Sequence, residues 1–205
     1  MITNVYVDAF NLYYRALKGT PYRWLDLRKM CEKLLPQNTI QDIKYFTAVV
    51  ESRPGDPNQQ QRQQAYLRAL QTIPGLTIHY GLFMTNPQRL PKTNPPPRTV
   101  EVLRSEEKGS DVNLATQLLV DGFKGRYEVA VVVSNDSDLK APIEAVRNEL
   151  HLPVGVVVPG SEKQIRRSAL PADFYRRIRL GVLRDCQLPP VITDPHGTVR
   201  KPRTW

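Results

Sequence analysis

Cysteine and long apolar runs are scarce in this chain of 205 residues, and each scarcity removes a class of protein. The two cysteines, Cys31 and Cys186, show no metal-type spacing, which argues against a disulfide scaffold and for a reducing compartment. No stretch approaches the roughly 20 apolar residues of a membrane-spanning helix. The first ten residues lack the charged and apolar regions of a secretory leader. We therefore expect a cytoplasmic protein with no membrane partner.

Several catalytic signatures are missing as well. The chain has no G-x-S-x-G elbow, no P-loop, and no glycine-rich dinucleotide fingerprint after its first expected strand. Its three histidines, His79, His151 and His196, lie far apart, and none has a partner at metal-ligand spacing. Core or surface roles suit these histidines better than catalysis. The chemistry, if any, has to come from other side chains.

Acidic side chains are the minority, because 20 Asp and Glu face 29 Lys and Arg, for a net charge of +9. The excess is uneven, since residues 151–205 carry ten basic and four acidic side chains. A basic surface of this kind favours a polyanionic partner. Nucleic acid and a membrane surface are the obvious choices, and of the two we expect nucleic acid and no membrane.

Strand-like and helix-like segments alternate along the chain. The pattern predicts strands at 2–8, 43–51, 76–81, 99–104, 127–135 and 154–159. It predicts helices at 10–17, 24–35, 58–70, 110–122, 138–150 and 161–169. Residues 84–98 contain five prolines and are expected to form an extended or mobile loop, and the tail from 187 is expected to be extended. Such alternation predicts an α/β sandwich with a mostly parallel sheet.

Polar side chains follow several of the expected strands. Asp8 ends the first strand and Asn11 comes three residues later, while Asp136 and Asp138 follow the apolar run "VAVVVSN". Asp111 lies in the first turn of the helix that follows "EEKGS". Chemistry in such folds collects at the carboxyl ends of the strands. Carboxylate and amide oxygens at this edge would suit Mg²⁺ or Mn²⁺.

A simpler explanation is open for each of these residues, because Asp commonly caps helices. Asp8, Asp136 or Asp138 could cap the helix that follows, and Ser110 with Asp111 suits a helix start, with Ser110 as the cap. Taken together the residues are harder to explain, since two carboxylates about 4 Å apart repel by roughly 4 kcal/mol at an effective dielectric constant of 20. A fold that gathers three or four carboxylates would need a cation or protonation to offset this repulsion.

Three segments, "VYVDAFNLYY", "EEKGSDVNLATQLLVD" and "VVVSNDSDL", together resemble the NYN domain, the LabA-like branch of the PIN-like nuclease fold. The resemblance runs in order over roughly residues 1–160. It implies a PIN-like α/β/α sandwich with a central, mostly parallel sheet, and a metal-dependent nuclease activity, mostly on RNA. Beyond it we expect a basic extension packed on the domain at 161–186 and a proline-rich basic tail at 187–205.

The resemblance also implies roles for single residues. The catalytic set would be Asp8, Asn11, Asp111, Asp136 and Asp138, and the four aspartates would hold Mg²⁺ or Mn²⁺. Asn11 would orient a water or a phosphate oxygen. Phosphate contacts are expected from basic side chains late in the chain and from one lysine beside a glycine: Arg166, Arg167, Arg176, Arg177, Arg179 and Lys108.

Two other functions stay open beside a nuclease that acts on RNA rather than DNA. The domain could be a catalytically silent module that binds nucleic acid or protein on the same fold. It could also be a phosphatase-like α/β enzyme, although the first strand lacks the second Asp and the Thr typical of that class. A homo-oligomer is compatible with the sequence.

Overall fold

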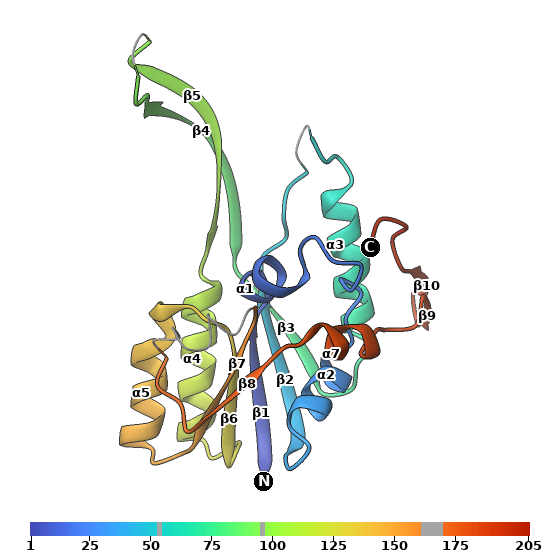
Figure 1. Cartoon of the computed structure of the whole chain (residues 1–205), viewed down its shortest axis with the longest axis vertical. Helices are drawn as coiled ribbons and strands as arrows, with labels where there is room; N and C mark the ends of the chain where they lie inside the picture. The colour runs from blue at the N-terminus through green and yellow to red at the C-terminus, as the bar shows by residue number, and fades with distance from the viewer. Residues whose placement is uncertain (53–54, 95–96, 161–169) are drawn as a thin grey trace.

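The computed structural model describes residues 1–52, 55–94, 97–160 and 170–205. Its centre is a six-stranded sheet with the order β3-β2-β1-β6-β7-β8, in which every neighbouring pair is parallel (Figure 1). The strands are β1 (Ile2–Asp8), β2 (Thr39–Thr47), β3 (Leu76–Tyr80), β6 (Val129–Val133), β7 (Val154–Val158) and β8 (Phe174–Arg177).

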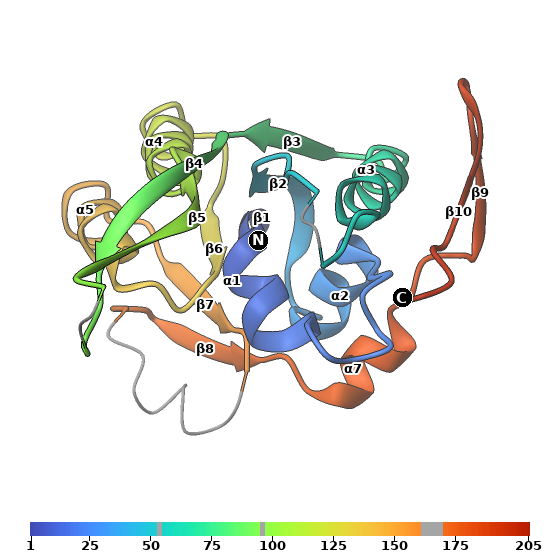
Figure 2. The same ribbon diagram turned by 90° about the horizontal axis from the view of Figure 1, so that it is seen from above.

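Helices cover both faces of this sheet (Figure 2). One face carries α4 (Ser110–Phe123) and α5 (Lys140–Glu149), and the other carries α2 (Leu27–Leu34), α3 (Gln59–Leu70) and α7 (Leu180–Asp185). The buried apolar residues accordingly form two clusters, one on each side of the strands. The predicted α/β/α sandwich with a parallel sheet is confirmed. No helix within the described ranges is long and apolar enough to cross a membrane.

Strand β1 shows why the sheet is buried on both sides. Val5 and Val7 point into one apolar cluster, and Tyr6 between them points into the other. Near-continuous apolar strands such as β6 and β7 are typical of a parallel sheet that is covered on both faces. Successive side chains of a strand alternate between the two faces of the sheet, so each strand contributes side chains to both apolar clusters.

A buried charged network ties α4 to the sheet. The Asp121 carboxylate has no exposed surface, and its Oδ2 accepts hydrogen bonds from Tyr6 Oη and Lys44 Nζ. Its Oδ1 accepts from Arg126 Nη1 at 3.0 Å. Burial alone would raise the pKa of Asp121, but the hydrogen bonds from Lys44, Tyr6 and Arg126 outweigh it and hold this pKa below its ordinary value. The buried Asp121 carboxylate is thus hydrogen-bonded by Tyr6 of β1, by Lys44 of β2 and by Arg126, which follows α4.

The prediction of a loop at 84–98 is wrong over its first half. Residues Leu82–Pro91 form β4, which pairs antiparallel with β5 (Thr99–Lys108) in a long two-stranded hairpin that rises from the sheet edge (Figure 1). Prolines are accepted in a strand that has a neighbour on one side only, because the missing N–H is not needed on the open side. At its base, the Phe83 ring stacks on Phe10 with a centroid distance of 6.4 Å.

The remaining elements refine the predicted boundaries. The first helix is α1 (Ala9–Leu12), which continues as the π-helical turn η1 (Tyr13–Leu17). The helix expected at 138–150 starts with the 3-10 turn η2 (Ser137–Leu139) before α5. The helix expected at 161–169 lies outside the described residues.

The tail is a hairpin of β9 (Val191–Asp194) and β10 (Gly197–Arg200) that packs Val199 into the core.

The C-terminal segments also contribute to the main body. Strand β8 is the sixth strand of the sheet, so the chain after residue 160 extends the sheet itself. Arg68 on α3 binds both carboxylate oxygens of Asp194 at 2.6 Å each, which fixes the β9–β10 hairpin beside α3. The Trp24 indole N–H donates to the Pro189 carbonyl at 2.8 Å. The proposed domain limits stay a prediction.

Candidate active site

Asp8 stands where β1 ends and α1 begins. Its side chain is 5% exposed, and Oδ1 accepts a hydrogen bond of 2.9 Å from the Asn11 backbone N–H, which makes Asp8 the cap of α1. Its Oδ2 accepts from Ser134 Oγ at 2.9 Å. Burial raises the pKa of Asp8, the two hydrogen bonds lower it, and the charges of Asp136 and Glu107 raise it again, with a net upward shift.

The ends of β1 and β6 are joined by side chains because these strands are parallel neighbours, with Val7 beside Val133. Asn11 Oδ1 accepts from the Asn135 backbone N–H at 3.2 Å. Ser134 Oγ, which donates to Asp8, also accepts from the Asp136 backbone N–H at 3.1 Å. The polar residues after the two strands therefore form one connected group.

Asp136 and Asp138 belong to the turn that follows β6. Asp136 caps η2, and its Oδ1 accepts from the Asp138 backbone N–H at 3.0 Å. Asp136 is half-buried and Asp138 is exposed. The capping explanation thus holds for Asp8 and Asp136, but each cap uses one carboxylate oxygen. Capping a helix and binding a ligand are compatible at both residues.

Asp111 comes to the same edge from the first turn of α4. Burial, together with the negative charges of Asp8, Asp136, Glu107 and Asp138, raises the pKa of Asp111 to about 6. Since the charges of the other three predicted aspartates all raise the pKa of Asp111, the four interact electrostatically. They come from three separate parts of the chain.

Glu107, at the end of β5, is a member of this group that sequence reasoning missed. Its Oε1 accepts from the Ser110 backbone N–H at 2.9 Å and from Ser110 Oγ at 2.6 Å. The expectation that Ser110 caps α4 is wrong: Gly109, with a φ of 94°, holds the cap position, and Ser110 is the first helical residue. The signal was present in "EEKGSD", where a glutamate precedes the helix start by three residues.

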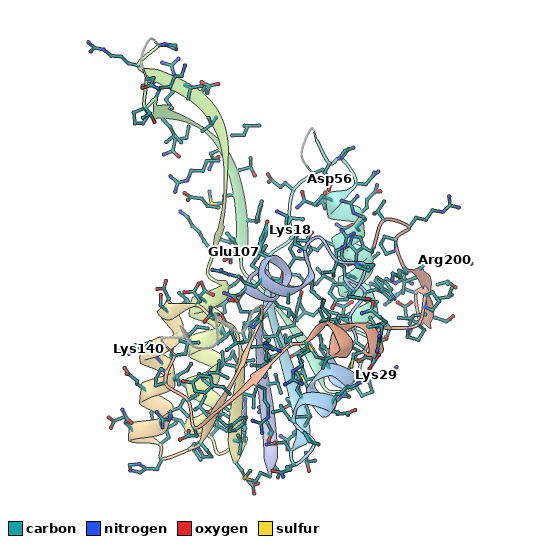
Figure 3. All side chains as sticks on the ribbon, viewed as in Figure 1. Lys18, Lys29, Asp56, Glu107, Lys140 and Arg200 are labelled. Atoms are coloured by element: carbon teal, nitrogen blue, oxygen red, sulfur yellow. The ribbon has the colours of Figure 1, made fainter. Side chains whose placement is uncertain are left out.

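Gly81 allows the base of the hairpin to approach this site. A Cβ atom at Gly81 would lie 2.6 Å from Glu107 Oε1 and 2.7 Å from the Lys108 carbonyl oxygen. Any larger residue would push β5 away from the start of α4. Figure 3 shows Glu107 at the foot of the hairpin, beside α1. Close packing at Gly81 therefore holds the foot of the hairpin against the acidic group, which consists of Asp8, Asp111, Asp136, Asp138 and Glu107.

Comparison with known proteins agrees with this architecture. The NYN domain family model matches residues 2–175. The chain belongs to the NYN family. This confirms the resemblance in sequence and places the chain on a nuclease-like fold.

Two individual proteins are similar to this NYN domain protein. The first, from Pseudomonas putida (strain DSM 28022 / S16), is named 6-hydroxy-3-succinoylpyridine 3-monooxygenase HspA; it is 34% identical over 235 residues, covering 99% of this chain and 75% of the relative. The second is a crystal structure of a protein of unknown function, VPA0982, from Vibrio parahaemolyticus RIMD 2210633. It matches with a TM-score of 0.51 and 17% identity, covering 91% of this chain and 96% of the other. This second likeness shows the fold alone.

The acidic group of the NYN domain has the donor chemistry of a magnesium or manganese site, since it offers carboxylate and amide oxygens. Within the described part of the chain, however, no three His, Cys, Asp or Glu side chains already stand where they could hold a metal ion together. The donor set fits a hard divalent cation, and ion binding would have to draw the carboxylates inward.

The basic residues predicted to contact phosphate fall in different places. Arg176 lies on β8 with its guanidinium 5.2 Å from the Phe174 ring centre, and Arg177 follows it on the opposite face of the strand. Arg179 is exposed at the start of α7. Lys108 is exposed at the end of β5, 3.8 Å from Glu106. Arg166 and Arg167 lie outside the described residues.

Proposed function

We propose that this protein is a divalent-metal-dependent nuclease that hydrolyses phosphodiester bonds in RNA. The observation that carries the proposal is that Asp8 and Asp136, linked through Ser134, follow neighbouring parallel strands, and that their charges act on Asp111. Membership of the NYN family supports it. Burial first, and then the negative charges of nearby carboxylates, raise the pKa of Asp111 to about 6, and a bound cation would offset both effects.

The four aspartates would hold one or two Mg²⁺ or Mn²⁺ ions. When bound, such an ion acts as a Lewis acid that makes a water more acidic and neutralises charge on the phosphate. The residues of the chain fix the geometry around it. Ser134 and the Asn11 backbone hold the Asp8 carboxylate, and Asn135 holds the Asn11 carbonyl oxygen. The Asn11 side-chain NH₂ group would then donate to a phosphate oxygen.

Basic side chains would position the rest of the strand. Arg176 and Arg179 offer exposed guanidinium groups, and Lys108 offers an ammonium group at the end of β5. Contacts of this kind set affinity and register without reading sequence. A preference for RNA over DNA, a homo-oligomer and a cytoplasmic location remain predictions.

The test is incubation with labelled single-stranded RNA, single-stranded DNA and duplexes in Mn²⁺, Mg²⁺ or EDTA. We expect cleavage of single-stranded RNA with Mn²⁺ or Mg²⁺ and none with EDTA. Binding of RNA without cleavage under every metal condition would instead support a catalytically silent module on the same fold.

A second candidate function rests on one observation, the 34% identity to a named monooxygenase over nearly the whole chain. The chain would then place one oxygen atom of O₂ on ring carbon 3 of 6-hydroxy-3-succinoylpyridine, with release of the succinoyl group from that carbon, while a two-electron donor such as NADH is oxidised and the other oxygen atom leaves as water. Incubation with 6-hydroxy-3-succinoylpyridine, NADH and O₂, followed by product analysis, separates this function from RNA cleavage.

A further inference from the structure

A pocket of about 240 Å³ lies between α1 and α3, next to the end of β1. Ala9 and Phe10, which directly follow Asp8, line it, and so does Thr47 at the end of β2. The Asp8 and Phe46 positions are neighbours in the β1–β2 ladder. The pocket therefore shares the carboxyl edge of the sheet with the acidic group.

Aromatic rings form the walls of this pocket. They are Tyr13, Tyr14, Tyr45, Tyr66 and Trp205. The Tyr66 and Trp205 rings are 5.5 Å apart at an angle of 61°, and Tyr45 meets Tyr66 nearly at right angles. Tyr66 Oη is fixed by a 2.8 Å hydrogen bond to the Leu25 carbonyl. Rings that hold one another edge to face make a rigid wall, against which a flat ligand ring can stack.

Three cations border the same pocket. Lys18 Nζ lies 4.9 Å from the centre of the Tyr14 ring, and the Arg23 guanidinium lies 5.9 Å from the centre of the Trp205 ring. Arg62 pairs with Asp56, the acidic residue in the lining. Figure 3 labels Lys18 beside α1 and Asp56 near the start of α3, and both residues line the pocket. The lining therefore carries a net charge of +2 from three basic and one acidic side chain.

We propose that this pocket binds one nucleotide, with its base stacked on the tyrosine and tryptophan rings and its phosphate beside Lys18 and Arg23. A flat aromatic ring that carries an anionic group matches both the walls and the charge. Stacking on aromatic side chains is tolerant of base identity, because every base has a π-face. The space is too small for more than about one such ligand.

The inference deepens the proposed function and rests on it for its choice of ligand. A strand whose phosphate lies at the acidic group would place a neighbouring nucleotide beside Ala9 and Phe10, at the mouth of the pocket. The pocket would then hold the strand in register for hydrolysis. A free mononucleotide offers the same chemistry, so the two sources have to be tested separately.

Nuclear magnetic resonance titration in EDTA measures binding without cleavage. The reporter is the indole N–H signal of Trp205, identified with a Trp205→Phe variant. Uridine 5′-monophosphate and a short uridine oligonucleotide should each shift this signal. Uridine, which lacks the phosphate, and ribose 5-phosphate, which lacks the base, should bind about tenfold more weakly or worse. Comparison of the shifts caused by the mononucleotide and by the oligonucleotide tells whether the pocket prefers a free nucleotide or a nucleotide within a strand.

Two exposed residues supply the variants, so folding is not at risk. Lys18→Ala removes a cation of the lining, and Tyr14→Ala removes a ring that is 51% exposed. Each should weaken nucleotide binding about tenfold. Arg15→Ala is the matched control, because Arg15 is an exposed cation on the same turn that does not line the pocket.

Three results would overturn the inference. They are no shift of Trp205 with either nucleotide, equal effects of Lys18→Ala and Arg15→Ala, and equally tight binding of 4-hydroxybenzoate, an aromatic anion without phosphate. These outcomes are independent of catalysis. Cleavage of RNA by a protein whose pocket ignores nucleotides would refute the pocket alone, and nucleotide binding without cleavage would refute the nuclease alone.

Discussion

A single oxygen of Glu107, Oε1, accepts hydrogen bonds from both the backbone N–H and the hydroxyl of Ser110. The end of β5 thereby holds the start of α4, and the charge of Glu107 reaches both Asp8 and Asp111. The hydrogen bonds between Glu107 and Ser110 therefore connect the hairpin to the acidic group at its foot.

Glu107→Gln should separate these two effects. The Gln carbonyl oxygen can still accept from Ser110, so α4 should keep its start, while the negative charge is removed. The pKa of Asp111 should fall from about 6 toward its ordinary value, as measured by carbon-detected nuclear magnetic resonance of the carboxyl groups. Glu106→Gln is the control, and an equal fall of the pKa in both variants would contradict a specific role of Glu107.

The stability of the metal-free protein should depend on the Asp111 carboxyl group. Its pKa in the folded protein, about 6, is raised above the ordinary value of 3.8 that it has when unfolded. The folded state therefore favours the protonated form, so this stabilisation is complete below pH 3.8 and is lost as the pH rises through 6. Urea unfolding between about pH 4 and 7 should show a decline that Asp111→Asn flattens. An unchanged slope in that variant would assign the decline to other groups.

The buried network under α4 should be costly to break. Asp121→Leu leaves the Lys44 ammonium group buried without its carboxylate, which we expect to lower the free energy of unfolding by about 3–5 kcal/mol. Adding Lys44→Met should recover much of that stability, because the pair is then replaced by apolar side chains. Urea unfolding of the single and double variants measures both effects. A double variant as unstable as Asp121→Leu alone would show that the network matters for packing rather than for charge.

Binding of single-stranded RNA should weaken as salt rises, and the late arginines should set part of that slope. In the triple variant Arg176→Ala, Arg177→Ala and Arg179→Ala, the slope of log affinity against log salt should fall by about 0.7 for each arginine that binds a phosphate. Arg184→Ala is the control, since Arg184 pairs with Asp185. Unchanged affinity and slope in the triple variant would mark these arginines as ordinary surface residues.

The parallel sheet was predictable because runs such as Val129–Val133 keep both faces apolar. The placement of Asp8 and Asp136 at one edge of it was predictable because Asp8 ends β1 and Asp136 lies three residues after β6. The β4 strand was not, since Pro87 and Pro91 argue against a strand unless it is known to have a neighbour on one side only. Glu107 gave a local signal, but its effect on Asp8 depends on contacts between distant parts of the chain.

The hydrophobic periodicity of the sequence could not predict the Lys44–Asp121 pair either. The two residues are 77 positions apart, and each alone looks like an ordinary charged residue on a surface. Only the packing of α4 on β1 and β2 brings them together. In the same way, the aromatic pocket draws its residues from α1, η1, β2, α3 and the end of the chain.

The rate of Mn²⁺-dependent RNA cleavage by Asp136→Asn decides whether the acidic group is a metal-dependent nuclease site. Asn can cap η2 about as well as Asp, so the fold should persist while one ligand charge is removed. Asp42→Asn, at the opposite end of the sheet in β2, is the control. We expect single-stranded RNA cleavage to fall by about a hundredfold or more in Asp136→Asn only. We also expect Mn²⁺ to stabilise that variant less than the parent, with melting of the metal-free form unchanged or raised. Full cleavage by Asp136→Asn with the same Mn²⁺-induced shift in melting would show that Asp136 does not hold the metal and only caps η2.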